Sequence, residues 1–281
     1  MISKSGKTCG YNYIFEQFGT IDEFIKTTEA RGISEAYKDN GTAKEMRSEY
    51  IERSSWAGVA SYSSAKEQFI QGTKAKAAMR QAYAATMISQ RREMVLAPCG
   101  AAPIVANALR GLPNSMIDIR RKREPRTARV VIDMSIPWNI GAKEITQAGR
   151  SIIEAVGKLD AQGVQTEIIC SNNVILAGEQ INACGVVIKT AGQAFNAARV
   201  SFSMSSPAFL RVFQLIYTSG KPGALYDSGY GGPVAHRLPK ADLPGYYESV
   251  FGKGLYISIS EVVKRGAAAI DEAIKSWRAT V

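Results

Sequence analysis

The stretch of residues 129–171 constrains the fold more than any other part of the sequence. It holds two apolar runs, 129–135 and 164–170, on either side of a helical pattern. The apolar residues of that pattern recur on one face of a helix: Ile145, Ala148, Ile152, Ile153, Val156 and Leu159. Continuous apolar runs around an amphipathic helix are typical of two buried parallel strands joined by a crossover. The stretch therefore predicts a right-handed β-α-β unit, and Ile152 and Ile153 are expected in its core.

The first apolar run ends on two polar residues, Asp133 and Ser135. In open sheets of this kind, ligands bind at the carboxyl ends of the strands, so a binding site is expected to begin with these two residues. The aspartate could bind a divalent cation through oxygen ligands. It could equally cap the turn that follows the strand, and we favour this second role, since it is common for aspartate and serine at such positions.

Composition and cysteine spacing exclude several classes of protein. The chain has 281 residues, a net charge of +10, four cysteines and one histidine. It shows no C-x-x-C pair, no signal peptide and no apolar run long enough for a transmembrane helix. The single histidine, His236, lies outside any nucleophile motif and is expected to be solvated. We therefore predict no catalytic residue, no cofactor, no bound metal and no membrane partner.

Residues 1–114 are predicted to form a mainly helical N-terminal extension, followed by an α/β domain at 115–281. Residues 1–55 are polar, with one helical segment near 21–30. Residues 3–8 imitate the end of a phosphate-binding loop, but the first glycine and the preceding strand of that motif are missing. A helix that Ser63 or Ser64 could cap, running through Phe69 to Gly72, comes next. A helical pattern at 73–94 and a short helix at 105–109, between prolines, complete the extension.

The strongest concentration of charge lies immediately before the first apolar run. It consists of Arg120, Arg121, Lys122, Arg123 and Arg126. Arginine side chains match phosphate oxygens, so the run could contact nucleic acid. It could equally be a solvated loop, which we favour on the sequence alone.

The C-terminal half is expected to contain two further strands and two further helices. Residues 171–173 are interpreted as a polar turn, and 184–189 and 255–260 as strands. Ser206 and Pro207 begin an apolar helix that should bury Ile216, and residues 261–277 form a closing helix. Residues 219–254 are rich in glycine and tyrosine and are interpreted as a loop that is mobile until a partner orders it.

The pattern Asp133-x-Ser135, with the helix and strand after it, resembles a von Willebrand factor A-type domain. That family's metal site uses Asp-x-Ser-x-Ser, and here Pro137 stands in the last position. The resemblance thus implies a three-layer, Rossmann-type α/β domain with a degenerate metal site. A closer similarity, to a poorly characterised phage-encoded branch of this fold, rests on Trp56-x-Gly58 and on residues 206–211. It covers about residues 50–260.

Three functions follow, and the first is favoured. It is a non-enzymatic phage protein that binds a protein partner or assembles with itself, in the cytoplasm of the infected bacterium or in the virion. The alternative is a nucleic-acid-binding protein that uses the basic run and a helix with Lys74, Arg80, Arg91 and Arg92. A metal-dependent hydrolase at Asp133 ranks last, because no second acidic ligand can be named.

Overall fold

The computed structural model describes residues 1–31, 57–59, 62–73, 76–87, 94–119, 126–137, 139–176, 180–219 and 232–280. The elements in chain order are β1 (Ile2–Thr8), β2 (Tyr11–Phe18), α1 (Ile21–Arg31), α5 (Tyr62–Gln71), α6 (Lys76–Met87), β3 (Met94–Ala97), β4 (Ala102–Pro103), α7 (Val105–Leu109), β5 (Met116–Ile119), β6 (Arg126–Asp133), α8 (Ala142–Ala161), β7 (Val164–Leu176), β8 (Gln180–Lys189), α9 (Ala197–Ser205), the π-helical η1 (Phe209–Gln214), α10 (Leu215–Ser219), β9 (Gly232–Pro233), α11 (Val234–Arg237), α12 (Leu243–Phe251), β10 (Leu255–Ser258), α13 (Ile259–Arg265) and α14 (Ala267–Thr280).

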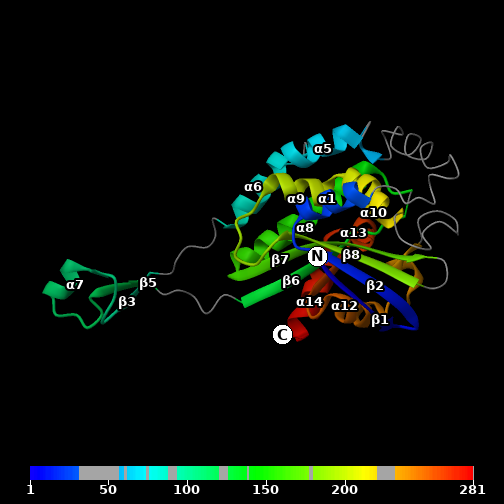
Figure 1. Ribbon diagram of the computed structural model, residues 1–281. Helices are drawn as coiled ribbons and strands as arrows, with labels where there is room; N and C mark the ends of the chain where they lie inside the picture. The colour runs from blue at the N-terminus through cyan, green and yellow to red at the C-terminus, as the bar shows by residue number, and fades with distance from the viewer. Residues whose placement is uncertain are drawn as a thin grey trace, which may run out of the picture.

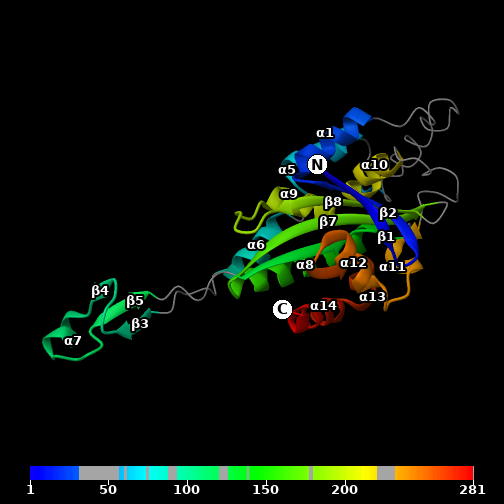
Figure 2. The same cartoon turned by 60° about the horizontal axis from the view of Figure 1, so that its bottom comes forward.

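A mixed seven-stranded sheet forms the centre of the molecule (Figures 1 and 2). Its strand order is β1-β2-β8-β7-β6-β10, and β9 pairs with β7. The strands β6 and β7 are parallel and are joined by α8, so the predicted β-α-β unit is confirmed. The strand β8 is antiparallel to β7, whereas β10 is parallel to β6. The sheet is thus neither purely parallel nor purely antiparallel.

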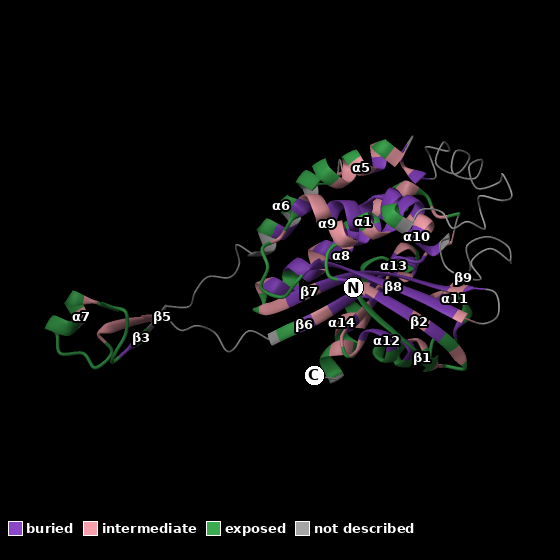
Figure 3. Ribbon diagram, viewed as in Figure 1, coloured by how far each residue is buried: buried purple, intermediate pink, exposed green. Residues whose placement is uncertain are grey.

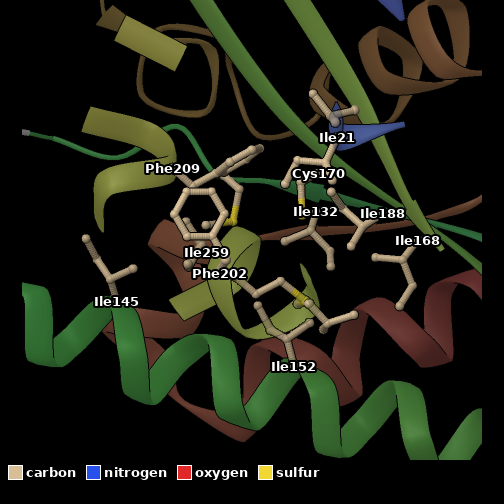
Figure 4. Close-up of a cluster of buried hydrophobic side chains, with 14 of the residues drawn as sticks. Ile21, Ile132, Ile145, Ile152, Ile168, Cys170, Ile188, Phe202, Phe209 and Ile259 are labelled. Carbon is tan, nitrogen blue, oxygen red and sulfur yellow. The ribbon is translucent and has the colours of Figure 1, made fainter. Parts of the chain in front are cut away.

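Each face of the sheet packs against its own layer of helices. Consecutive strand residues alternate between the two sides, since Ile132 belongs to the cluster under α8 and α9 and Val131 to the cluster under α12. Figure 4 shows the first cluster, in which Ile145 and Ile152 of α8 point toward the sheet residues Ile132 and Ile168. The predicted α/β class is therefore confirmed, as a mixed sheet with helices on both faces.

The predicted core of the crossover helix is also confirmed. Ile152 and Ile153 are both fully buried. Ile216 was expected to be buried as well, but it is only half-buried at the edge of the same cluster. It follows the π-helical turn η1, which buries Phe209 and Phe213 instead.

The prediction of a mainly helical N-terminal extension is wrong for its first residues. The strands β1 and β2 form an antiparallel hairpin, and β2 pairs in parallel with β8, so this segment belongs to the central sheet. The residues that imitate a phosphate-binding loop lie within β1. The two helices expected near 21–30 and 73–94 exist as α1 and α6, and Met79 and Tyr83 of α6 are buried.

The boundary predicted at residue 114 falls inside a small, separate sheet. The strands β3, β5 and β4 pair in that order, and the short helix α7 lies between β4 and β5, as predicted. In Figures 1 and 2 this unit, residues 94–119, is a body of its own beside the central sheet.

Three predictions for the C-terminal half are wrong. Residues 171–173 are not a turn but lie in the middle of β7, where all three are buried. The described part of the expected glycine- and tyrosine-rich loop contains α11 and α12, and Tyr246 and Tyr247 of α12 are buried. The closing helix is broken at Gly266, whose φ of +62° favours glycine, into α13 and α14.

The helices α8 and α9 approach each other closely at Gly149. A Cβ atom added there would overlap the carbonyl oxygen of Met204 in α9. Alanine usually stabilises a helix relative to glycine, but here it would force the two helices apart. We expect Gly149→Ala to lower the free energy of unfolding by roughly 1–3 kcal/mol, measured by urea denaturation.

Gly245, in α12, is the matched control. No atom lies within 4 Å of the position that its Cβ would take. Gly245→Ala should therefore raise the free energy of unfolding by about 0.5–1 kcal/mol, as expected from helix propensity alone. Equal effects of the two substitutions would show that α8 and α9 are not in contact at Gly149.

Candidate functional site

Asp133 lies where the sequence predicts it, at the carboxyl end of the central strand β6, and it is 1% exposed. Its Oδ1 atom accepts a hydrogen bond of 3.0 Å from the backbone N–H of Ser135. This bond to the residue two positions on closes a turn, so the predicted capping role is confirmed. Its Oδ2 atom accepts a bond of 2.6 Å from the hydroxyl of Tyr247, in α12.

Ser135 joins this aspartate to the middle of β7. Its hydroxyl donates to Oδ1 of Asn172 at 3.1 Å and accepts from the backbone N–H of Asn173 at 2.6 Å. The Asn173 side chain in turn donates to the Ser171 hydroxyl and accepts from the Tyr246 hydroxyl. We call these residues the strand-end cluster: Asp133, Ser135, Ser171, Asn172, Asn173, Tyr246 and Tyr247.

Burial dominates the electrostatics of the strand-end cluster. Removal from water raises the pKa of Asp133 above its usual range, and the hydrogen bonds from Ser135, Tyr247 and Asn173 oppose that shift only in part. Burial, with the nearby Asp133 carboxyl, also raises the pKa of Tyr246 and Tyr247 well above the ordinary value. Both tyrosines are therefore neutral hydrogen-bond donors at physiological pH.

The contacts of the strand-end cluster do not fit a metal ion. Both carboxylate oxygens of Asp133 and the hydroxyl of Ser135 already take part in protein hydrogen bonds. The third position is Pro137, which offers no side-chain ligand. Among the residues that the structure describes, no three His, Cys, Asp or Glu side chains are placed to share an ion. The arrangement supports hydrogen bonding inside the protein and not metal chemistry.

A pocket of about 510 Å³ adjoins the strand-end cluster. It shares Tyr247 with the cluster and also contains Ser258, which pairs with Asp133 across the sheet. Its walls come from α12, β10, α13 and α14, beside the outer edge of the sheet. Apolar and aromatic side chains line it, among them Leu243, Pro244, Tyr256, Val262, Ala273 and Trp277. Charged side chains line it as well: Lys240, Glu248, Lys253, Glu261, Arg265 and Glu272. The apolar part of this lining suits an apolar group from a partner.

Comparison with protein families gives a match that spans nearly the whole chain. The model of a domain of unknown function, DUF7192, matches residues 5–270. The chain belongs to this family. Comparisons with curated proteins and with solved structures gave no significant match. The DUF7192 match includes most of β1, in agreement with the place of the N-terminal hairpin in the central sheet.

The basic run cannot be placed in this DUF7192 domain. Arg120, Arg121, Lys122 and Arg123 lie outside the described residues, as does the side chain of Arg126. The next arginine, Arg129, is described. It pairs with Glu167 at 2.7 Å and donates to the Phe251 carbonyl, so it is engaged within the protein.

The basic helix of the alternative hypothesis is described only in part. Lys74, Arg91 and Arg92 also lie outside the described residues, and Arg80 is exposed. None of the helices in the described part of the chain combines the length and apolar character of a membrane span.

One contact near the pocket could not be predicted from the sequence. His236, in α11, is exposed as predicted, but its Nε2 atom lies 2.7 Å from the hydroxyl of Ser260 in α13. Burial and the nearby Lys264 lower the pKa of His236. No hydrogen bond joins its other ring nitrogen to a carboxylate in the described structure, so the pair lacks the third member of a triad. Only the fold brings α11 and α13 together.

The pH dependence of stability tests the buried state of Asp133. An unfolded aspartate ionises near pH 3.9, whereas the raised pKa means that the folded protein holds this proton more tightly. Above about pH 4, ionisation therefore opposes folding, and the wild type should lose stability relative to Asp133→Asn as pH rises to about 7. Urea denaturation of both proteins at about pH 4 and about pH 7 gives this difference in the free energy of unfolding. The other carboxyl groups are common to both proteins, so their contributions cancel.

Asp133→Ala separates this charge effect from the hydrogen bonds. It leaves the Tyr247 hydroxyl and the Ser135 N–H without their acceptor, so we expect a loss of about 2–5 kcal/mol at both pH values. Asparagine can accept from Ser135 and donate to Tyr247, so it should be much less harmful. Equal losses in the alanine and asparagine variants would contradict the contacts described above.

Proposed function

We propose that the protein is a non-enzymatic protein-binding or assembly module, built on a von Willebrand A-like domain with a degenerate metal site. The observation that carries this proposal is the contrast between the strand-end cluster and the pocket next to it. At the strand end, every polar group of Asp133 is used inside the protein. Next to it, the pocket between α12 and α14 is open, and apolar and aromatic side chains line it together with charged ones of both signs.

The von Willebrand A-like part of the proposal is supported by the position of Asp133. The residue ends the strand β6, α8 follows, and β7 lies beside β6 in parallel. This is the order of elements on which the resemblance rests. The origin in a phage and the location in an infected bacterium or a virion are proposals that rest on the resemblance alone.

Nucleic-acid binding is the second candidate function. The net charge of +10 and the run from Arg120 to Arg126 favour it, since neutralised phosphates release counterions. The charged residues that line the pocket do not favour it, because basic and acidic residues are balanced there: Lys240, Lys253 and Arg265 with Glu248, Glu261 and Glu272.

Affinity purification tests the protein-binding proposal. The tagged chain is purified from cells that make it, with and without nuclease, beside a Ser276→Arg variant. Ser276 lines the pocket and is exposed, so arginine should block the pocket without disturbing the fold. We expect wild type to retain a stoichiometric protein, or further copies of itself, that the variant does not retain. Retention of nucleic acid alone, with nothing left after nuclease, would contradict the proposal.

Salt dependence tests the alternative. If the five basic residues of the run contact duplex DNA, the logarithm of the binding constant should fall with the logarithm of salt with a slope of about −4 to −5. Neutralising Arg121 and Arg123 should reduce that slope by nearly 2. An unchanged slope would place the contact elsewhere, and no retention on DNA or RNA at low salt would exclude this function.

A further inference from the structure

A small polar cavity lies between the central sheet and α10. It has a volume of about 10 Å³. Five buried polar side chains line it, and they come from β2, β7, β8 and α10: Glu16, Asn172, Asn182, Tyr217 and Thr218. In Figure 3 the strands β2, β7 and β8 are buried over most of their length, so these polar groups lie inside the molecule.

The register of the sheet gathers three of these side chains on one face. Glu16 of β2 and Asn172 of β7 both pair with Cys184 of β8, so the three residues form a row across the strands. Asn182 precedes Cys184 by two positions, and its side chain therefore lies on the same face, in the next row. Side chains paired across strands have Cβ atoms about 5 Å apart, so one small molecule can bridge them.

One polar atom of this lining lacks a hydrogen bond. Asn182 is 8% exposed, and its Nδ2 atom has no hydrogen-bond partner in the described part of the chain. The Oδ1 atom of the same amide accepts a bond of 3.3 Å from the Gln180 side chain, in agreement with this orientation of the amide. Native proteins rarely leave a buried N–H without an acceptor. The cavity is therefore expected to contain one.

Two neighbours of Asn182 supply the other polar groups of the cavity. The Glu16 carboxyl group accepts a hydrogen bond from the Tyr217 hydroxyl, and a carboxylate can accept about four such bonds. The Thr218 hydroxyl accepts a bond of 3.4 Å from Nδ2 of Asn172 and can donate its own hydrogen. The molecule that fits this cavity best accepts from Asn182 and Thr218 and donates to Glu16.

We propose that the cavity is a binding site for one ordered water molecule, held by Asn182, Thr218 and Glu16. A buried water needs at least about 10–15 Å³ and typically makes about three hydrogen bonds, and the cavity meets both conditions. A cation does not fit, because it cannot accept a hydrogen bond from the Asn182 amide. An apolar guest would leave that amide without a partner.

The water extends the hydrogen bonds of the strand-end cluster to the N-terminal hairpin. Asn172, a member of that cluster, accepts from the Ser135 hydroxyl and donates to Thr218. From Thr218 the water continues the chain of hydrogen bonds to Glu16 in β2. The same network therefore stabilises the end of β6 and the attachment of β2 to β8, which belong to opposite ends of the sequence.

The number of long-lived internal waters tests this site in solution. Oxygen-17 magnetic relaxation dispersion counts such waters in the full chain. Asn182→Leu removes the amide and fills the space with a side chain of similar size, so we expect the variant to hold one long-lived water fewer than wild type. The control is Ile14→Leu, which also changes the lining of the cavity but removes no polar atom, and its count should equal that of wild type. Circular dichroism shows that each variant is folded.

A crystal structure of the wild-type protein tests the site without any variant. We expect an electron-density peak at about 2.7–3.2 Å from both Nδ2 of Asn182 and the Glu16 carboxyl group. An empty cavity, or equal water counts in wild type and Asn182→Leu, would overturn the proposal. A peak that acquires anomalous scattering in crystals grown with rubidium or thallium salts would identify a monovalent cation and would overturn it as well.

Discussion

The fold depends on burying both faces of the three central strands. Val131 and Ile132, neighbours in β6, belong to different hydrophobic clusters, and Ile168 and Ile169 of β7 divide in the same way. A strand that is apolar on both sides needs a layer of helices on each side. The helices α8 and α9 form one layer and α12 contributes to the other. Since α12 comes from a distant part of the sequence, the sheet is complete only when the C-terminal third has folded onto it.

Because helices cover both faces of the sheet, the polar residues at the ends of the apolar runs are covered as well. Where β6 and β7 end their apolar runs, α12 already covers them, and Tyr246 and Tyr247 reach the side chains of Asn173 and Asp133. Buried polar groups are tolerated when every one has a partner, and here a single network satisfies them. The aspartate that would face a ligand in an open sheet therefore holds a helix in place. The open space lies in the neighbouring pocket, which is lined by β10, at the edge of the sheet, and by α14.

The small unit of residues 94–119 differs from the central sheet in how it treats its apolar residues. The central sheet buries its apolar residues and shields its polar ones, whereas the unit around α7 is held by backbone bonds and exposes its leucines. An exposed patch of this kind marks an interaction surface more often than an accident of folding. The exposed side chains of this unit and the pocket beside α14 both leave apolar surface uncovered.

Local patterns in the sequence were enough to predict the elements whose signal lies within the segment itself. The β-α-β unit, the burial of Ile152 and Ile153, the helix α7, the strand β10 and the place of Asp133 at a strand end all follow from period and from apolar runs. The hairpin β1-β2 was missed because β1 is an exposed edge strand, which shows no alternation of apolar residues. The backbone hydrogen bonds that pair β1 with β2 can form in any sequence, so they leave no signal in the residue types.

The partners of Asp133 were decided only by the tertiary structure. Ser171, Asn172 and Asn173 looked like a turn because three consecutive polar residues rarely lie in a buried strand. They do so here because Ser135 and Tyr246, far away in the chain, supply their hydrogen bonds. The sequence placed the carboxylate, but only the packing of α12 determined that it is buried and engaged. Hydrogen bonds between distant segments leave no periodic signal, because the donor and the acceptor meet only after the chain has folded.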